Sequence, residues 1–115
     1  MNIEELREIC TSFPHVTEDI KWGKDLCFSV GGKMFCATGT DKAGGPISFK
    51  CTPEKFAELV EREGIIPAPY VARYHWVAVE DPAVLDEEEF EDLISKSYLL
   101  VFENLPLKDR KNLGK

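Results

Sequence analysis

Basic side chains near a predicted β-hairpin are the residues of this sequence best suited to binding an anion. Five of them fall on the hairpin, on its flanks or before a later predicted strand: Lys21, Lys24, Lys33, Lys50 and Arg73. Their candidate neighbours are Ser48, Tyr70, His75 and Trp76. Lysine and arginine contact phosphate oxygens, so the set predicts a patch for an anionic partner. The alternative interpretation is a scatter of solubilising lysines that bind nothing.

Aromatic residues define a second candidate site, for a protein or a small ligand, made of Trp22, Tyr70, His75 and Trp76 with Ser48 beside them. Trp22 can equally anchor its loop, because so large an aromatic contributes most by burial. The sequence has two histidines and no nucleophile elbow, phosphate loop or dinucleotide fingerprint. It therefore predicts neither an enzyme nor a cofactor.

Acidic residues gather at the start of the last predicted helix, namely Glu87, Glu88, Glu89, Glu91 and Asp92. Carboxylates one turn apart can share a divalent cation, but a high-affinity calcium loop is absent from the sequence. The helix dipole also favours acids at a helix N-terminus. The pattern favours a solvated acidic face and no metal site, with metal binding at this helix kept as the alternative.

The net charge of −7 argues against a protein that binds DNA over its whole surface. The charge is uneven, however. Residues 20–53 hold five lysines against two aspartates, residues 80–103 hold nine acids against Lys96, and the segment from Asn104 holds four bases against Asp109. An anionic partner would therefore meet the hairpin region or the C-terminal tail.

The segment Leu26 to Gly39 predicts a hairpin that turns at Gly31-Gly32, since a two-residue primed turn needs positive φ. A two-residue loop places Val30 opposite Lys33 and Cys27 opposite Cys36. One face then carries Leu26, Phe28, Val30, Phe35 and Ala37 as the core face, and the other carries Cys27, Ser29, Met34, Cys36 and Thr38. Cys27 and Cys36 can meet in this register, but all four cysteines are interpreted as buried, inert thiols.

The other elements follow from apolar periodicity and from helix-end signals. Helices are predicted over residues 3–12, from Pro53 with Thr52 as N-cap, and from Asp86 to about Asn104; strands are predicted over residues 47–51 and 75–79. Residues 15–25, 40–46 and 65–73 are predicted as irregular, and 107–115 as a basic tail with little fixed structure. The order α-β-β-β-α-β-α predicts an α+β fold, a two-layer sandwich with helices on one face of a mainly antiparallel sheet.

The length of 115 residues is that of one domain, spanning residues 1–115. The sequence shows neither a secretory segment nor an apolar run long enough to cross a membrane. We therefore expect a cytoplasmic protein with no membrane partner.

An ordered set of short motifs resembles the MmcQ/YjbR family. It runs through Trp22-Gly23, residues 28–35, residues 48–54, Pro67-Ala68-x-Tyr70, His75-Trp76, Ser97-Tyr98 and Leu105-Pro106. The resemblance implies a fold similar to that of the frataxin homologue CyaY. It also implies DNA binding through a double-wing motif. The wings would be the turn at Gly31-Gly32 and the loop Thr40–Pro46, with Lys33, Lys42 and Lys50 as phosphate contacts.

Overall fold

The computed structural model describes residues 2–21, 25–39, 46–69 and 71–113. The helices are α1 (Ile3–Thr11), α2 (Pro53–Leu59), α3 (Glu87–Glu103) and α4 (Leu107–Leu113), with short 3-10 turns η1 (Ala72–Tyr74) and η2 (Pro82–Val84). The strands are β1 (Val16–Lys21), β2 (Asp25–Val30), β3 (Lys33–Gly39), β4 (Ile47–Lys50), β5 (Ile65–Pro67) and β6 (Trp76–Val79).

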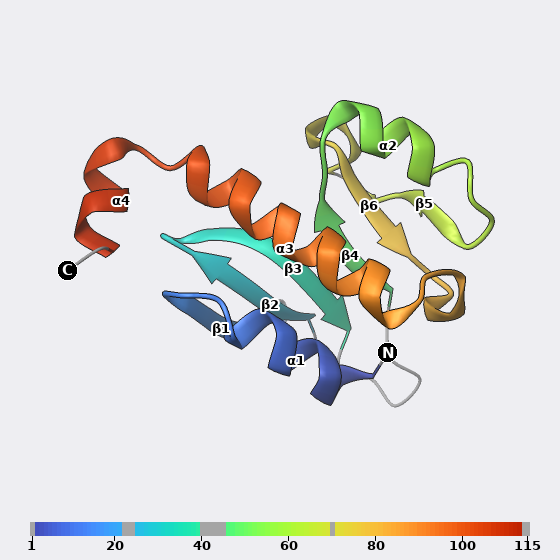
Figure 1. Ribbon diagram of the computed structural model, residues 1–115, viewed down its shortest axis with the longest axis horizontal. Coiled ribbons are helices and arrows are strands. Elements are labelled where there is room, and N and C mark those ends of the chain that lie inside the picture. The colour runs from blue at the N-terminus through green and yellow to red at the C-terminus, as the bar shows by residue number, and fades with distance from the viewer. Residues whose placement is uncertain (1, 22–24, 40–45, 70, 114–115) are drawn as a thin grey trace.

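All six strands form one sheet of order β1-β2-β3-β4-β6-β5, in which each neighbouring pair is antiparallel. Helices α1 and α3 lie across one face of it, and α2 packs beside β5 and β6 (Figure 1). The main core fills the space between the layers, with Phe28, Phe35, Phe49 and Phe90 fully buried. The predicted two-layer α+β sandwich is confirmed.

Local signals place the helix starts where the sequence predicted them. The side chains of Asn2, Thr52 and Asp86 each accept a hydrogen bond from the backbone N–H three residues ahead. These caps satisfy amides that have no partner inside their own helix. The long helix α3 then buries one face on the sheet, through Phe90, Ile94 and Tyr98 among others.

Two strands and one helix were missed by the sequence prediction. Strand β1 falls in the segment expected to be irregular, because its side chains are mostly exposed and its sequence lacks apolar alternation. Strand β5 is short and lies at the sheet edge, where Pro67 costs no central hydrogen bond. Helix α4 replaces most of the predicted flexible tail, and the buried side chain of Leu105 ties the preceding turn to the core.

The predicted hairpin forms, and its register changes at a bulge. Val30 pairs with Lys33 and Ser29 with Met34, as predicted, but Phe28 then pairs with Cys36 instead of Phe35. One extra residue in β3 turns every later side chain to the opposite face. Cys36 and Thr38 therefore share a face with Phe28 and Leu26, whereas Ala37 moves to the open face. Phe35 lies in the core as predicted, and the predicted faces of β3 are wrong from Cys36 onward.

Ser97 bridges the sheet where the bulge interrupts it. The ladder between β3 and β4 ends at the pair Cys36 and Phe49. Beyond that pair, the hydroxyl of Ser97 accepts a hydrogen bond from the Lys50 N–H (2.9 Å) and donates one to the Phe35 carbonyl (2.7 Å). A fully buried serine of α3 thus takes the place of one strand-to-strand contact. Next to it, the Tyr98 hydroxyl donates to the carbonyl of Pro14 (2.7 Å).

The hairpin turn has the predicted conformation, with φ of 59° at Gly31 and 79° at Gly32. Gly31 also lies next to the side chain of Leu105, and a Cβ at this position would lie 2.6 Å from the Leu105 Cδ1 atom. Nothing lies within 4 Å of a Cβ built on Gly32. A substitution at Gly32 therefore introduces only backbone strain, whereas a substitution at Gly31 introduces backbone strain and a steric clash with Leu105.

We expect Gly32→Ala to lower the free energy of unfolding by about 1 kcal/mol through the left-handed backbone alone. Gly31→Ala should cost about 2 kcal/mol, because the buried Leu105 must also move. Urea denaturation of the two variants measures the difference. Equal losses would show that the contact between the turn and Leu105 contributes nothing.

Candidate functional site

The structure brings three of the predicted basic residues to one end of the sheet. Lys33 is exposed at the hairpin turn, and Lys50 ends β4 at the same end of the strands. The two residues belong to opposite faces of the sheet, because Lys33 pairs with the core residue Val30 and Lys50 pairs with Trp76. The Lys50 Nζ donates to the Tyr74 carbonyl (2.7 Å), and the guanidinium of Arg73 lies 4.8 Å from the ring centre of Tyr74. Lys33, Lys50 and Arg73 therefore share one end of the molecule.

Lys21 lies at the other end of the sheet. It closes β1 opposite Asp25, while Val16, at the start of that strand, lies opposite Val30 beside the turn. Lys24 and Lys42 lie outside the described residues. The predicted patch of lysines is thus divided between two ends, about 20 Å apart for a six- or seven-residue strand.

The two predicted wings are divided in the same way. The turn at Gly31-Gly32 precedes β3, and the loop Thr40–Pro46 follows it, so the two connections begin at opposite ends of one strand. Residues 40–45 of that loop lie outside the described residues.

The two aromatic candidates that the structure describes, His75 and Trp76, have different surroundings. The Trp76 side chain is buried on the sheet face away from the helices, with Ala68 and Ala78, and Ser48 of β4 shares that face because it pairs with Ala78. His75 adopts a left-handed conformation (φ 66°), and its ring packs edge-on against Phe56 of α2 with the ring centres 5.8 Å apart. Trp22 and Tyr70 lie outside the described residues.

Helix α4 adds basic residues to the end of the molecule that carries the hairpin turn. Leu105, which precedes α4, packs against Gly31 of the β2–β3 turn, and Figure 1 shows α4 following the C-terminal end of α3. Lys108 and Lys111 are exposed and Arg110 is half-buried. We call Lys33, Lys108, Arg110 and Lys111 the basic end. The contact of Leu105 with Gly31 thus brings basic residues about 75 positions apart in the sequence to the same region of the molecule, with Asp109 as the single acid of α4.

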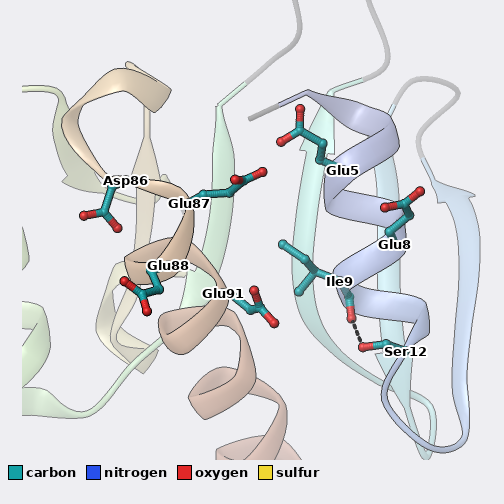
Figure 2. A pocket seen from close by; sticks show the side chains of 8 residues that line it. All are labelled: Glu5, Glu8, Ile9, Ser12, Asp86, Glu87, Glu88 and Glu91. Carbon is teal, nitrogen blue, oxygen red and sulfur yellow. Dashed lines mark hydrogen bonds between the residues drawn. The ribbon is translucent and has the colours of Figure 1, made fainter.

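The acidic residues gather in a groove between α1 and the start of α3 (Figure 2). The groove has a volume of about 680 Å³, and its carboxylates come from Glu5, Glu8, Asp86, Glu87, Glu88 and Glu91. In Figure 2 the side chains of Glu5 and Glu87 point toward each other across the groove. The hydrogen bond with Glu5 and the negative charge of Glu5 raise the pKa of Glu87. We call this surface the acidic groove.

The acidic groove includes three of the carboxylates considered above for a divalent cation, namely Glu87, Glu88 and Glu91. Among the residues that the structure describes, no three His, Cys, Asp or Glu side chains are arranged to hold a metal ion. In the first turn of α3, the Glu89 carboxylate makes a contact within the chain and accepts two hydrogen bonds from Arg62 (2.9 and 3.0 Å). A second bidentate pair, Arg7 with Glu18, joins α1 to β1 and lowers the pKa of Glu18. Arg7 and Arg62 therefore join elements of the fold through ion pairs.

The cysteines are buried, free thiols, as the sequence predicted. Cys27 pairs with Ala37 across the hairpin, so the Cys27–Cys36 contact does not form. The bulge instead turns Cys36 toward Cys10 of α1, and hydrogen bonding with Cys10 and burial raise the pKa of Cys36 well above its usual range. Burial raises the pKa of Cys51 to about 11. A thiol that stays protonated is a poor nucleophile.

These raised pKa values predict a loss of stability in alkali. An unfolded cysteine ionises near pH 8.5, so above that pH the unfolded state loses protons that the folded thiols keep. The free energy of unfolding should therefore fall from about pH 8.5 to pH 11. In Cys51→Ala, the fall between pH 7.5 and 10.5, measured by urea denaturation, should be smaller than in the parent protein. An identical fall would contradict the assignment to Cys51.

No helix in the described ranges is long and apolar enough to cross a membrane.

Comparisons with known proteins agree with this architecture. The YjbR family model matches residues 11–100. The crystal structure of the Deinococcus radiodurans protein DR2400, with domain DUF419, has a TM-score of 0.88 at 29% identity and covers 98% of this chain and 88% of that one. A crystal structure of a protein from Pseudomonas syringae has a TM-score of 0.70 at 22% identity, covering 88% of this chain and 99% of that one. No curated protein matches the chain.

Proposed function

The chain belongs to the YjbR family, and from that premise we propose that it is a non-enzymatic module that binds DNA weakly through its basic end. The observation that carries the proposal is the separation of charge. Two cationic segments distant in sequence meet at the hairpin turn, and six carboxylates line the acidic groove. A protein of net charge −7 can approach a polyanion only in an orientation that presents such a cationic surface.

The basic end suits phosphate contacts. Lys33, Lys108 and Lys111 are exposed, and none of the salt bridges formed within the described part of the chain involves them. An ammonium group offers three donors and no fixed geometry, which is enough for a phosphate oxygen. Lys50 and Arg73 lie beside Tyr74 and form a second, separate pair of cations at the same end of the strands.

Sequence-specific recognition is not part of the proposal. Reading bases requires several side chains in the major groove, usually from a helix or a ribbon. The hairpin turn consists of two glycines, and α4 has seven residues. Binding that depends on phosphate contacts alone has dissociation constants of about 10⁻⁴ to 10⁻⁶ M at physiological salt.

The proposal that the chain has no enzyme activity is supported by the surroundings of His75, Cys36 and Cys51. The ring of His75 is packed against Phe56, away from the open-face surface of Ser48 and Trp76. Cys36 and Cys51 have raised pKa values and are buried. A general base and an activated nucleophile must lie within hydrogen-bonding reach of each other, and these residues do not supply such a pair.

The location of binding can be tested by NMR. A ¹⁵N-labelled sample is titrated with a short DNA duplex at low salt. We expect amide shifts at Lys33, Lys108 and Lys111 and little change at Glu5 and Glu87, which serve as internal controls. Shifts concentrated around Ser48 and Trp76 would instead support the second candidate site, on the sheet face away from the helices. Shifts at the acidic groove would contradict the proposal.

A further inference from the structure

A groove between α2 and α3 is separate from both the basic end and the acidic groove. It has a volume of about 390 Å³, within the range of about 300–1,000 Å³ that is usual for small-ligand sites. Its lining from the two helices consists of Lys55, Leu93, Lys96, Leu99, Leu100 and Glu103, and Cys51 closes one side. We call it the α2–α3 groove.

The outer wall of this groove includes an exposed leucine, Leu99, that is not part of the core. Leu99 is 47% exposed, although it lies on a helix whose other face already fills the core with Phe90, Ile94 and Tyr98. A polar residue is expected at an exposed helix position, so Leu99 gains nothing from the fold itself. Together with Leu93 and Leu100 it gives the groove a leucine lining.

Two ammonium groups flank these leucines from different helices. The Lys55 Nζ lies 3.2 Å from Glu58, and the Lys96 Nζ lies 3.0 Å from Asp92. Each pair lies within a single helix; the second is largely exposed, and the Lys55 side chain is half-buried. Ion pairs of this kind contribute little to the stability of the fold. Each lysine ammonium has three N–H donors, so it can also bind a ligand. Glu103 is the one acid among the lining residues, so the lining carries two ammonium groups against one carboxylate.

From this arrangement we propose that the α2–α3 groove binds a small amphipathic carboxylate. The apolar part of the ligand would lie on Leu99 and Leu100, above the buried Leu93, and its carboxylate would meet Lys55 and Lys96. The charge of the lining selects an anion over a neutral or cationic molecule of the same shape. This site is independent of DNA binding, since it uses no residue of the basic end.

The test uses anilinonaphthalene sulfonate, a fluorescent amphipathic anion, with decanoate as competitor. We expect saturable fluorescence enhancement that decanoate reverses and that decanol reverses less well. Leu99→Ser should weaken probe binding about tenfold by removing half-buried apolar contact. Lys96→Gln should weaken it about fivefold. The matched control is Leu107→Ser, since Leu107 is 59% exposed and lies outside the groove.

Each other outcome overturns the proposal. Absence of saturable enhancement, or equal binding by Leu99→Ser and Leu107→Ser, would show that the groove does not hold the probe. Equal competition by decanol would remove the role of the carboxylate. Sedimentation identifies the remaining occupant, because a dimer lost in Leu99→Ser but kept in Leu107→Ser would show that a second copy of the chain fills the groove.

Discussion

Replacing Ser97 with alanine is expected to lower the free energy of unfolding by about 2–4 kcal/mol, because two buried backbone groups lose their partner. The Lys50 N–H and the Phe35 carbonyl both bond to the Ser97 hydroxyl, which is fully buried. The bulge removes the strand-to-strand alternative, so neither group has a replacement in the sheet. Urea denaturation followed by circular dichroism measures the loss.

Ser95→Ala is the matched control for this prediction. Ser95 lies on the same helix, two residues earlier, and is only partly buried. Alanine has the higher helix propensity, so this change should alter the free energy of unfolding by about 0.5 kcal/mol or less. If Ser97→Ala costs no more than Ser95→Ala, the serine bridge does not hold β3 and β4 together.

The second large effect is expected on DNA affinity. Reversing three charges of the basic end, in the variant Lys33→Glu, Lys108→Glu, Lys111→Glu, should weaken DNA binding about 100-fold. This estimate assigns about 1 kcal/mol to each lost phosphate contact. Repulsion between the new carboxylates and the phosphates adds to the loss. Fluorescence anisotropy of a labelled duplex measures the affinity of both proteins at one low salt concentration.

A triple variant with the same net charge provides the control. Lys21→Glu, Lys55→Glu, Lys96→Glu changes three lysines that lie away from the basic end, at the far end of β1 and along the α2–α3 groove. Its affinity should fall far less than that of the basic-end variant. Similar losses in the two variants would show that net charge, rather than a particular surface, governs the interaction.

The sequence predicted the layers of this fold better than its details. Capping residues and apolar periodicity identify α1, α2 and α3, and the glycine pair identifies the turn. The bulge at Phe35 depends on Ser97, which is 62 residues away, so no local pattern reports it. The exposed strand β1 carries no apolar alternation, because it lies at the sheet edge.

The candidate site was predictable in part. Lys33 follows from the turn, and both cationic segments are visible as local charge excess. Their meeting depends on Leu105, whose packing against Gly31 places α4 beside the turn. The predicted aromatic cluster divides at His75, because its left-handed backbone turns the ring toward Phe56 while Trp76 remains on the open face. A sequence pattern assigns strand faces by alternation and does not reveal such a reversal.

The salt dependence of DNA binding tests the central claim most directly. Anisotropy of a labelled duplex is titrated with the protein at several salt concentrations. If the three exposed lysines and Arg110 of the basic end contact phosphates, log K should fall linearly with log[salt] with a slope of about −3 to −4. Binding should be micromolar at low salt. Absence of binding at low salt, or an affinity that salt does not change, would contradict the account.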